Sequence, residues 1–499
     1  MRKLIESMKR ASLCLLAWLD PEKGYFPTGG YEVAHDTGRW WDAMLRMEAV
    51  SGISIPGWAE DAMYGNLQML MDNETGFLSN RPDIEWMKSK GIFNPHNIRE
   101  AMLALSGLVK YRNDNWAAEK GHQLLENLKD AENRDGSFDY VKISKKMNMP
   151  INEAHSLGKL DGTSSEGRAL EAIMLFYKAT KDPLAMEMSD KIALRHFKNT
   201  VKPDGHIPQR IISRDNLGHN HSYLGTLRGL LKYGLLTGNP DFINSVSQTY
   251  NESIFKNNIS YAGWAPHDLG MRRFNNDDGD PEGDPASCGD VAQIALWLAL
   301  ENGQTELLDD VERLLRARLI PQQITGNTDP RKNGAWGIYR HPFGFGVILD
   351  VFAAVLHTFT DIYGNVITDF GDEKQINLHF DIKTPGLELK AVNKEKRILT
   401  INIKEKVNLR IRIPEWVEKS KVTANVDANE LEHLVFNDSH LIIDRKLISN
   451  GSTVEITYDL PIHETIEKMK VSSREFKLTW KGDEVISCEP EVPMYKHIY

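Results

Sequence analysis

The chain has 499 residues, of which 41% are hydrophobic and 26% charged, and its formal net charge at pH 7 is −10. Because single hydrophobic cores usually stop growing at roughly 250 to 300 residues, this length predicts at least two domains or one unusually large one. The acidic balance argues against a nucleic-acid binder, which needs a basic face to neutralise phosphates, and against a membrane-surface role.

The N-terminal stretch MRKLIESMKRASLCLLAWLD is interpreted as a native first helix. Basic residues precede an apolar run, as in a signal peptide, but no small-residue cleavage site follows and Glu6 lies in the basic part. Leu4, Met8 and Leu15 recur at helical spacing. We therefore expect a cytoplasmic protein. No apolar run approaches the roughly 20 residues needed to cross a bilayer.

The first three quarters of the chain repeat a pair of helices at a loose period of about 60 residues. Six segments begin with a polar cluster and are apolar nearly all round, which is typical of interior helices. They start at His35, Asn94, Thr163, His219, Ser287 and His341. Six amphipathic helices, each with one charged face, alternate with them. These start near Leu4, Pro56, Asn115, Pro183, Pro240 and Thr305.

A turn and a short apolar stretch follow each amphipathic helix, as in DNETGFLS, NRDGSFDY and KPDGHIPQ. The turn residues supply unusual backbone angles, and the apolar residue anchors the return to the next interior helix. Twelve helices with six equivalent returns predict an (α/α)6 toroid over residues 1–370, with an open helical solenoid as the alternative. The interior helices would run parallel, so their N-termini would meet at one end of the ring.

The pattern changes from about Lys374 onward. Segments such as NLHFDIK, ILTINIK, STVEITYDLPI and EFKLTWKGDEVISCEP alternate apolar and polar residues and are rich in β-branched residues. This pattern predicts an antiparallel β-sandwich over residues 371–499. Ile411 and Val454 are expected in its core, and no chemistry is expected there.

The polar clusters at the interior helix N-termini form the predicted site. Helix capping needs only Ser, Thr, Asp or Asn, so histidine and arginine at equivalent places favour a function. The cluster consists of His35, Asp36, Arg39, Trp40, Trp41, His96, Asn97, Arg99, Glu100, Ser165, Glu166, Arg168, His219, Asn220, His221, Tyr223, Cys288, Asp290, Arg340 and His341.

Structural explanations compete with the functional one. Asp36 and Asp290 suit helix caps or first-turn acids, and Glu166 lies three residues after Thr163, as in a capping box. The Trp40 and Trp41 rings suit the core as well as a sugar-stacking surface. The arginines suit either a structural ion network with the carboxylates or the binding of an anionic substrate.

The acidic run before the fifth interior helix hints at calcium through Asp278, Asp280, Glu282 and Asp284. The EF-hand pattern fails, because the twelfth position from Asp278 is glycine rather than glutamate. A solvated acidic lid is the favoured interpretation. The three cysteines, Cys14, Cys288 and Cys488, are too far apart for a Cys-x-x-Cys motif, so no disulfide framework, metal or cofactor is expected.

A toroid followed by a β-sandwich resembles the six-hairpin (α/α)6 glycoside hydrolases, in particular the β-L-arabinofuranosidase-like families (glycoside hydrolase family 127) and the β-glucuronidase-type families. NLRIRIPEW from Asn408 resembles the region after the toroid in those enzymes, and SCGDVAQIALW lies where they carry a cysteine-bearing helix mouth. The arabinofuranosidases hold zinc with several cysteines and a glutamate, whereas this chain has only Cys288 in that region. Carboxylate chemistry is therefore expected. A weaker resemblance is to the unsaturated glucuronyl hydrolases.

We therefore predict an exo-acting glycoside hydrolase that cleaves a small oligosaccharide bearing a uronic or similar acidic sugar. Glu166 and Asp290 are the predicted catalytic carboxyls, with Asp36 in reserve and His221 tuning the acid. Arg39 and Arg168 would hold the carboxylate of the sugar. The full set of predicted substrate-binding residues is His35, Arg39, Trp40, Trp41, His96, Asn97, Arg168, His219, Tyr223, Trp264, His267 and Cys288.

Two other functions stay open on the sequence alone. One is a polysaccharide lyase, in which Asn220, His221, Tyr223 and an arginine would neutralise a uronate carboxyl and abstract the neighbouring proton. The other is a non-catalytic carbohydrate-binding protein. The absorbance of an unsaturated product separates elimination from hydrolysis.

Overall fold

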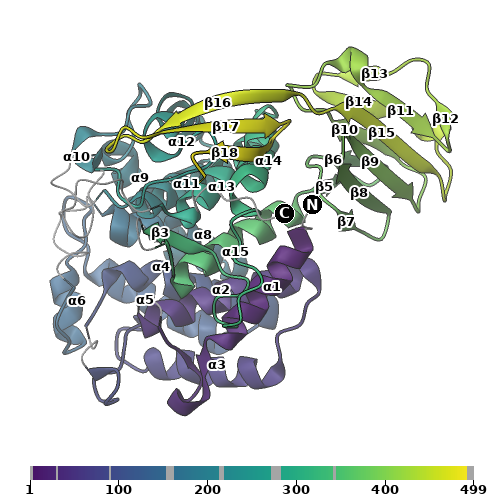
Figure 1. The fold of residues 1–499 in the computed structure, drawn as a ribbon. Coiled ribbons are helices and arrows are strands. Elements are labelled where there is room, and N and C mark those ends of the chain that lie inside the picture. Colours follow the sequence, from purple (N-terminus) through teal and green to yellow (C-terminus); the bar gives the residue numbers. More distant parts are fainter. Residues whose placement is uncertain are drawn as a thin grey trace.

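The computed structural model joins a ring of helices to a strand-rich C-terminal part (Figure 1). For residues 339, 340, 344 and 345 it describes the backbone alone. The residues described are 4–29, 32–88, 92–152, 162–212, 218–270, 283–340 and 344–491.

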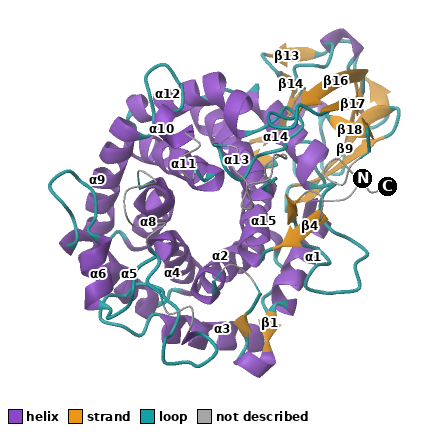
Figure 2. Cartoon of the chain, turned by 60° about the vertical axis from the view of Figure 1, so that its left-hand side comes forward, coloured by secondary structure: helices purple, strands orange, loops and turns teal. Residues whose placement is uncertain are grey.

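Six helices form the inner ring of a toroid, seen along its axis in Figure 2. They are α2 (Val33–Ser51), α4 (Ile98–Arg112), α8 (Arg168–Thr180), α11 (Asn220–Thr237), α13 (Pro285–Asn302) and α15 (Leu349–Gly364). Each helix contacts the next, and α15 contacts α2, so the ring is closed. The predicted toroid is confirmed, and the open solenoid is excluded.

A second ring of helices surrounds the first (Figure 2). It contains α1 (Leu4–Ala17), α3 (Gly57–Leu70), α5 (Asn115–Asp130), α9 (Pro183–Asn199), α12 (Pro240–Thr249) and α14 (Leu307–Leu314). The last two continue as π-helical turns over Tyr250–Asn258 and Leu315–Leu319. Inner and outer helices alternate along the chain as predicted. The short helices α6 (Tyr140–Lys146) and α10 (Gln209–Ile212) and the hairpin of β1 (Leu19–Asp20) and β2 (Phe26–Pro27) lie in the connections.

Local capping residues set the helix ends. Asp182 accepts a hydrogen bond from the Leu184 amide (2.9 Å) at the start of α9, and Asn239 accepts one from the Asp241 amide (3.1 Å) at the start of α12. In both cases a proline follows the cap, where its missing N–H costs nothing. Gly238 ends α11 with a φ of 69°, a left-handed conformation that favours glycine. These signals are local, which is why the sequence located the helices well.

The sixth inner helix departs from the prediction. It begins at Leu349 and not at His341, because the preceding segment forms a hairpin of β3 (Gly337–Arg340) and β4 (Gly344–Val347). Glycines alternate with Phe and Val in β4, and glycine is a poor helix former. His341 and the side chain of Arg340, both placed at the predicted helix mouth, lie outside the described residues.

The C-terminal part contains two packed sheets. Their strand orders are β13-β14-β10-β6-β5 and β12-β11-β15-β9-β8-β7, and every pair is antiparallel except β6 with β10. The strands are β5 (Ile367–Asp369), β6 (Glu373–Ile376), β7 (Ile382–Lys383), β8 (Leu387–Asn393), β9 (Lys396–Ile403), β10 (Asn408–Arg412), β11 (Thr423–Val426), β12 (Asn429–Glu430), β13 (Val435–Asn437), β14 (His440–Ile443) and β15 (Thr453–Asp459). Ile411 and Val454 are fully buried between them, as predicted.

The last three strands form a sheet of their own. They are β16 (Ile462–Lys468), β17 (Glu475–Lys481) and β18 (Glu484–Glu489), and they lie beside α14 (Figures 1 and 2). Alternate residues Phe476, Leu478 and Trp480 form one apolar cluster with Trp264 and Ala317 of the toroid. The placement of EFKLTWKGDEVISCEP in the sandwich was therefore wrong, because its apolar face is covered by the toroid.

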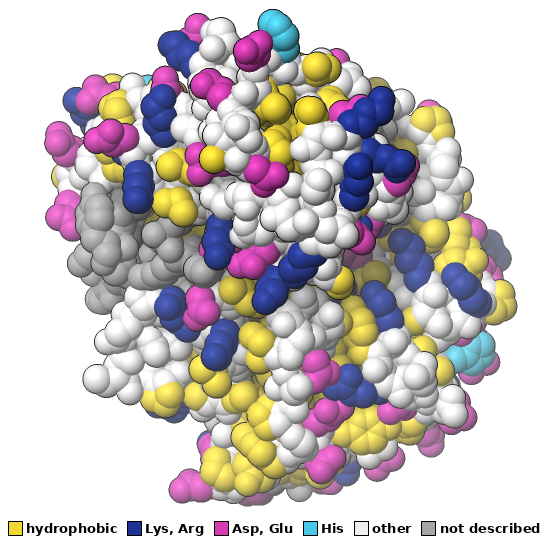
Figure 3. All heavy atoms as spheres, turned by 90° about the vertical axis from the view of Figure 1, so that its right-hand side faces the viewer, with side chains coloured by type: hydrophobic (Ala, Val, Ile, Leu, Met, Phe, Trp, Pro, Cys, Tyr) yellow, Lys and Arg dark blue, Asp and Glu magenta, His cyan; other side chains and the backbone are white. Residues whose placement is uncertain are grey.

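The molecular surface carries charges of both signs. Figure 3 shows the face that lies to the right in Figure 1. Acidic and basic side chains are interspersed on this face. Within the described residues, no helix is long and apolar enough to cross a membrane.

A buried ion network joins the sandwich to the toroid. Glu312 of α14 accepts hydrogen bonds from Arg412 (2.8 Å) and Arg397 (3.1 Å), which lie on β10 and β9. Arg316 lies 3.5 Å from the same carboxylate, and the His379 amide also donates to it. Burial alone would raise the pKa of Glu312, but the three arginines outweigh it and lower the pKa to about 2.

We predict that Glu312→Gln destabilises the protein by about 3–5 kcal/mol, because it removes the one buried carboxylate that Arg316, Arg397 and Arg412 share. Since the folded-state pKa lies below the ordinary 4.5, this contribution is present above about pH 4.5 and is lost as pH falls towards 2. Urea unfolding of both proteins at pH 7 and pH 3 measures the effect. Glu306→Gln, an exposed residue at the start of the same helix, is the control. Equal stabilities of Glu312→Gln and wild type at pH 7 would contradict this account.

Candidate active site

A row of histidine rings links the N-termini of α2, α4 and α11. His35 stacks on His96, with 5.3 Å between ring centroids, and His96 lies 5.9 Å from His219. His219 in turn lies 6.1 Å from His221 and 4.6 Å from His267. Five of the predicted site residues are therefore brought together at one end of the ring, although they come from three helices and one loop.

Glu100 is the centre of the charges at this end of the ring. Its Oε1 accepts hydrogen bonds from Arg99 (2.8 Å) and Arg168 (2.8 Å) and lies 3.3 Å from Nε of Arg39. The carboxylate is fully buried, and the three arginines come from α2, α4 and α8. Arg39 and Arg168 were predicted to hold a substrate carboxylate. In the structure both bind a carboxylate of the protein itself, which is the ion-network alternative.

His221 connects these arginines to Asp290. Its Nε2 accepts hydrogen bonds from Arg39 (2.8 Å) and Arg99 (3.0 Å), so the proton of the ring is on Nδ1. Nδ1 lies 2.5 Å from Oδ2 of Asp290 and donates to it. Burial, followed by the charges of Arg39 and Arg228, lowers the pKa of His221 well below its ordinary value. His221 is therefore a neutral bridge with a defined tautomer.

Asp290 lies in the second turn of α13 and has both oxygens occupied. Oδ2 accepts from His221, and Oδ1 accepts from Arg228 (2.8 Å). Arg228 also pairs with Glu171 at 2.5 Å. Burial raises the pKa of Asp290 to about 6 even though Arg228 opposes this shift. A carboxyl with this pKa changes its protonation state near neutral pH, as a general acid requires.

Asp350 is a carboxylate of the site that the sequence analysis missed. It lies in the first turn of α15, and its Oδ2 is 3.5 Å from Nε2 of His35. Burial alone would raise the pKa of Asp350, but the hydrogen bond and charge of His35 lower it. The side chain is 19% exposed. Reading the Gly-Phe-Gly-Val segment as a strand would have moved the helix start to Leu349 and revealed this acid.

His35 is held between two acids. Its Nε2 lies 3.6 Å from Glu100 and 3.5 Å from Asp350, and its Nδ1 is 2.9 Å from Oδ1 of Asn97. Burial would lower the pKa of His35, but Glu100 and then Asp350 outweigh it and raise the pKa to about 9. His35 therefore carries a proton at neutral pH. The side-chain NH2 group of Asn97 donates to Glu32 (2.6 Å), which fixes the orientation of the Asn97 side chain.

Glu166 has hydrogen-bond partners of its own. Its Oε2 accepts hydrogen bonds from Tyr140 (2.6 Å) and Ser165 (2.5 Å), and its Oε1 lies 3.3 Å from Arg195. Tyr140 belongs to α6 and Arg195 to the outer helix α9, so this carboxylate is engaged between the two rings. It shares none of these partners with Asp290. The two carboxyls thus have separate sets of partners, and their role as a catalytic pair stays a prediction.

The predicted aromatic surface is buried. Trp40 and Trp41 have no exposed area, and Nε1 of Trp41 donates to the carbonyl oxygen of Met63. Trp264 belongs to the apolar cluster beneath β16–β18. As folded, these rings fill the protein interior and offer no sugar-stacking surface, because the space around them is occupied by α3 and the C-terminal sheet.

Cys288, Tyr223 and Asp36 are also buried. Burial raises the pKa of the Cys288 thiol to about 12 despite the nearby Arg318, so it is not an activated thiolate. Burial also raises the pKa of Tyr223, whose hydroxyl has no hydrogen-bond partner among the described residues. Asp36 lies in the first turn of α2.

Asp284 is a helix cap and not part of a solvated lid. It accepts hydrogen bonds from the Ala286 amide (2.9 Å) and the Ser287 hydroxyl (2.8 Å) at the start of α13. Burial raises its pKa to about 7. The rest of the predicted acidic lid, Asp278 to Glu282, lies outside the described residues. In the part of the chain that is described, no group of three or more His, Cys, Asp or Glu side chains is placed to hold a metal ion.

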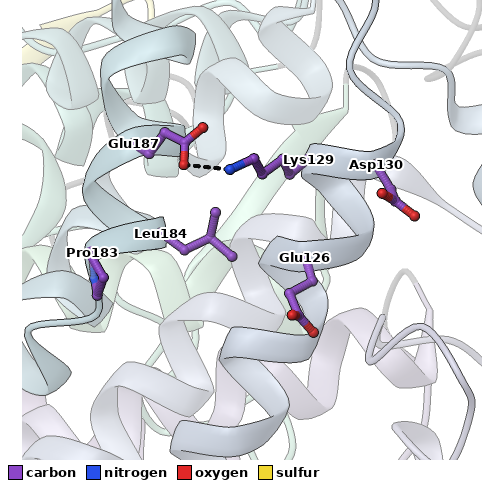
Figure 4. A pocket seen from close by; sticks show the side chains of 6 residues that line it. All are labelled: Glu126, Lys129, Asp130, Pro183, Leu184 and Glu187. Carbon is purple, nitrogen blue, oxygen red and sulfur yellow. Dashed lines mark hydrogen bonds and ion pairs between the residues drawn. The ribbon is translucent and has the colours of Figure 1, made fainter.

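A surface hollow of about 420 Å³ lies between the outer helices α5 and α9. Figure 4 shows its lining, which is Glu126, Lys129, Asp130, Pro183, Leu184 and Glu187. Lys129 and Glu187 form an ion pair of 2.7 Å on its wall. No inner helix contributes to it, so it is separate from the histidine row.

The fold is shared with solved glycoside hydrolases. A family 127 β-L-arabinofuranosidase from Geobacillus stearothermophilus T6 aligns over 97% of this chain and 80% of its own, with a TM-score of 0.59 and 12% identity. Another family 127 β-arabinofuranosidase aligns over 97% and 81%, with a TM-score of 0.59 and 11% identity. A third structure, a glycoside hydrolase, aligns over 90% and 77%, with a TM-score of 0.59 and 14% identity.

These likenesses confirm the six-hairpin glycosidase fold expected from the sequence. No protein-family model matches the chain, and no curated protein sequence does. The similarity is thus one of architecture, because at 11 to 14% identity a shared fold does not by itself carry over a reaction.

We predict that Asp350→Asn lowers the pKa of His35 from about 9 towards its ordinary value, because one of the two acids that hold its proton is lost. An NMR titration of the His35 ring nitrogens measures this shift. Asp361→Asn, at the other end of α15 and bound to His357, is the control and should leave His35 unchanged. An unaltered His35 titration in Asp350→Asn would show that the two side chains do not interact.

Proposed function

We propose that this chain is a glycoside hydrolase in which Asp290 and Asp350 supply the two carboxyl groups of the reaction. The observation that carries the proposal is the opposite direction of their pKa shifts on neighbouring inner helices. Burial raises the pKa of Asp290 to about 6, whereas His35 lowers that of Asp350. Environments that separate the pKa values of two carboxyls assign an acid and a base.

Asp290 takes the role of general acid. In its protonated form it gives its proton to the glycosidic oxygen as the bond to the sugar breaks. The carboxylate that remains is then stabilised by Nδ1–H of His221 and by Arg228, which already contact its two oxygens. His221 and Arg228 are thus positioning residues for the acid.

Asp350 takes the role of base or nucleophile. It is ionised at neutral pH, and it is more exposed than the other carboxyls of the site. Its Oδ1 has no hydrogen-bond partner among the described residues. This oxygen is also buried, so we propose that substrate binding brings water or the anomeric carbon to it.

The substrate that we propose is a small oligosaccharide attacked from its end. The shared fold with family 127 arabinofuranosidases supports a sugar substrate. Arg39 and Arg168, which suggested an acidic sugar, both bind Glu100. The structure therefore lends no support from these two arginines to a uronic acid, and neutral glycosides belong in the first screen together with uronides.

We predict that Asp290→Asn and Asp350→Asn each lower kcat by about 10²–10⁴-fold, because each removes a proton-transfer or nucleophilic group. Glu166→Gln, the matched control, should change kcat by less than about tenfold, since its carboxylate is bound by Tyr140 and Arg195. A panel of chromogenic glycosides, with thermal unfolding of each variant, measures both effects. Loss of turnover in Glu166→Gln with normal turnover in Asp350→Asn would overturn the assignment. A product with the absorbance of an unsaturated uronide would indicate a lyase.

The pH profile gives a separate prediction. We expect kcat/KM to fall as pH rises through about 6, because Asp290 must be protonated, and to fall at low pH only below the ordinary pKa of 3.8, where Asp350 takes up a proton. Rates on one glycoside between pH 3 and pH 9 test this. An alkaline limb far above pH 6 would exclude Asp290 as the acid.

A further inference from the structure

A small cavity lies inside the toroid, between α2, α4, α8, α11 and α15. Its volume is about 10 Å³, which is the order of space that a single water-sized particle needs. The polar residues that line it are Arg39, Arg99, Arg168, Arg228, Glu171 and His357. The glycosidase proposal uses some of these side chains, but it gives the cavity itself no role.

The lining carries a surplus of positive charge. Arg39, Arg99 and Arg168 share the single carboxylate of Glu100. His357 does not add to this surplus, because it is already paired with Asp42 (2.7 Å) and Asp361 (3.3 Å). Glu171 is the one carboxylate of the lining, and it already pairs with Arg228. Glu100 and Asp290 bind the same arginines as partners outside the lining.

Two of the arginines have unused donors. The Nε–H groups of Arg168 and Arg228 have no hydrogen-bond acceptor within the described residues. Both side chains are more than nine-tenths buried, with 1% and 6% exposure. A buried donor without an acceptor is costly, so a group that accepts hydrogen bonds there would stabilise the fold.

We propose that this cavity binds one chloride ion. A monatomic anion accepts hydrogen bonds from several guanidinium groups at once and offsets their charge. A water molecule is the alternative occupant, since it can donate a hydrogen bond to Glu171, but it would not offset the charge of the arginines. Polyatomic oxyanions such as phosphate or sulfate are larger than a halide and fit this small space less well.

A second hollow lies next to the cavity. It lies at the C-terminal ends of α2, α4 and α8, has a volume of about 160 Å³, and shares Leu103 with the cavity. Arg46, Lys110 and Lys178 line it together with the single acid Asp42. Its positive charge favours the arrival of anions at the side of the ring opposite the histidine row.

Gly225 offers a way to fill the cavity without breaking the fold. It lines the cavity from α11, and a Cβ at this position would meet its nearest neighbours, Arg99 and Arg168, at 3.4 and 3.6 Å, which is ordinary contact. Gly225→Ala should therefore fold and occupy part of the space of the ion. Gly65→Ala in α3 is the matched control, because a Cβ there meets nothing within 4 Å. Both changes also replace glycine by a better helix former.

The test compares thermal unfolding in sodium chloride, sodium bromide and sodium gluconate at equal ionic strength. We expect chloride and bromide to raise the Tm of wild type and of Gly65→Ala saturably, by roughly 2 °C or more over gluconate. Gly225→Ala should lose this difference. Crystals of the wild-type protein grown with sodium bromide should show an anomalous peak among Arg39, Arg99, Arg168 and Arg228.

Two results would overturn the proposal. One is equal Tm values for wild type in gluconate, chloride and bromide, together with a water molecule in place of the bromide peak. The other is an unchanged halide response in Gly225→Ala, which would place any bound ion elsewhere. The crystallographic arm uses wild-type protein, so the proposal remains testable if Gly225→Ala fails to fold. Neither measurement depends on glycosidase activity.

Discussion

One buried carboxylate, that of Glu100, balances the charges of three arginines from three inner helices. Burying a guanidinium group without a counter-charge is costly. The N-terminal parts of α2, α4 and α8 must therefore keep the relative positions that bring their arginines to Glu100. The same carboxylate lies 3.6 Å from His35, which extends the network to Asp350 on α15. One ion network therefore both connects neighbouring helices of the ring and forms the polar site.

This network decides the proton positions in the site. Arg39 and Arg99 donate to Nε2 of His221, which forces the proton of His221 onto Nδ1 and towards Asp290. Glu100 and Asp350 keep His35 protonated. One histidine is thus neutral and the other charged, although both are buried in the same row. Burial lowers the pKa of both rings. Glu100 and Asp350 outweigh it for His35, whereas the charges of Arg39 and Arg228 add to it for His221.

The junction between the toroid and the sandwich has the same arrangement, a buried glutamate bound by several arginines. Glu312 accepts hydrogen bonds from Arg397 and Arg412 of the sandwich, as Glu100 does from the arginines of the ring. Asp483, in the turn between β17 and β18, binds Arg397 as well, so the third sheet is tied to the same point. Buried acids shared among several arginines thus hold separate parts of the chain in one relative orientation.

The sequence by itself determined the architecture, because periodicity, caps and turn residues act over a few neighbouring positions. The alternation of helices, the start of α9 near Pro183 and the change to strands near Lys374 were all predicted from it. Which carboxyls meet was decided only by the tertiary structure. Glu166 binds Tyr140 and Arg195. Asp350, which follows the β3–β4 hairpin, contacts His35. Neither contact was predicted, because side-chain partners depend on elements that are far apart in the chain.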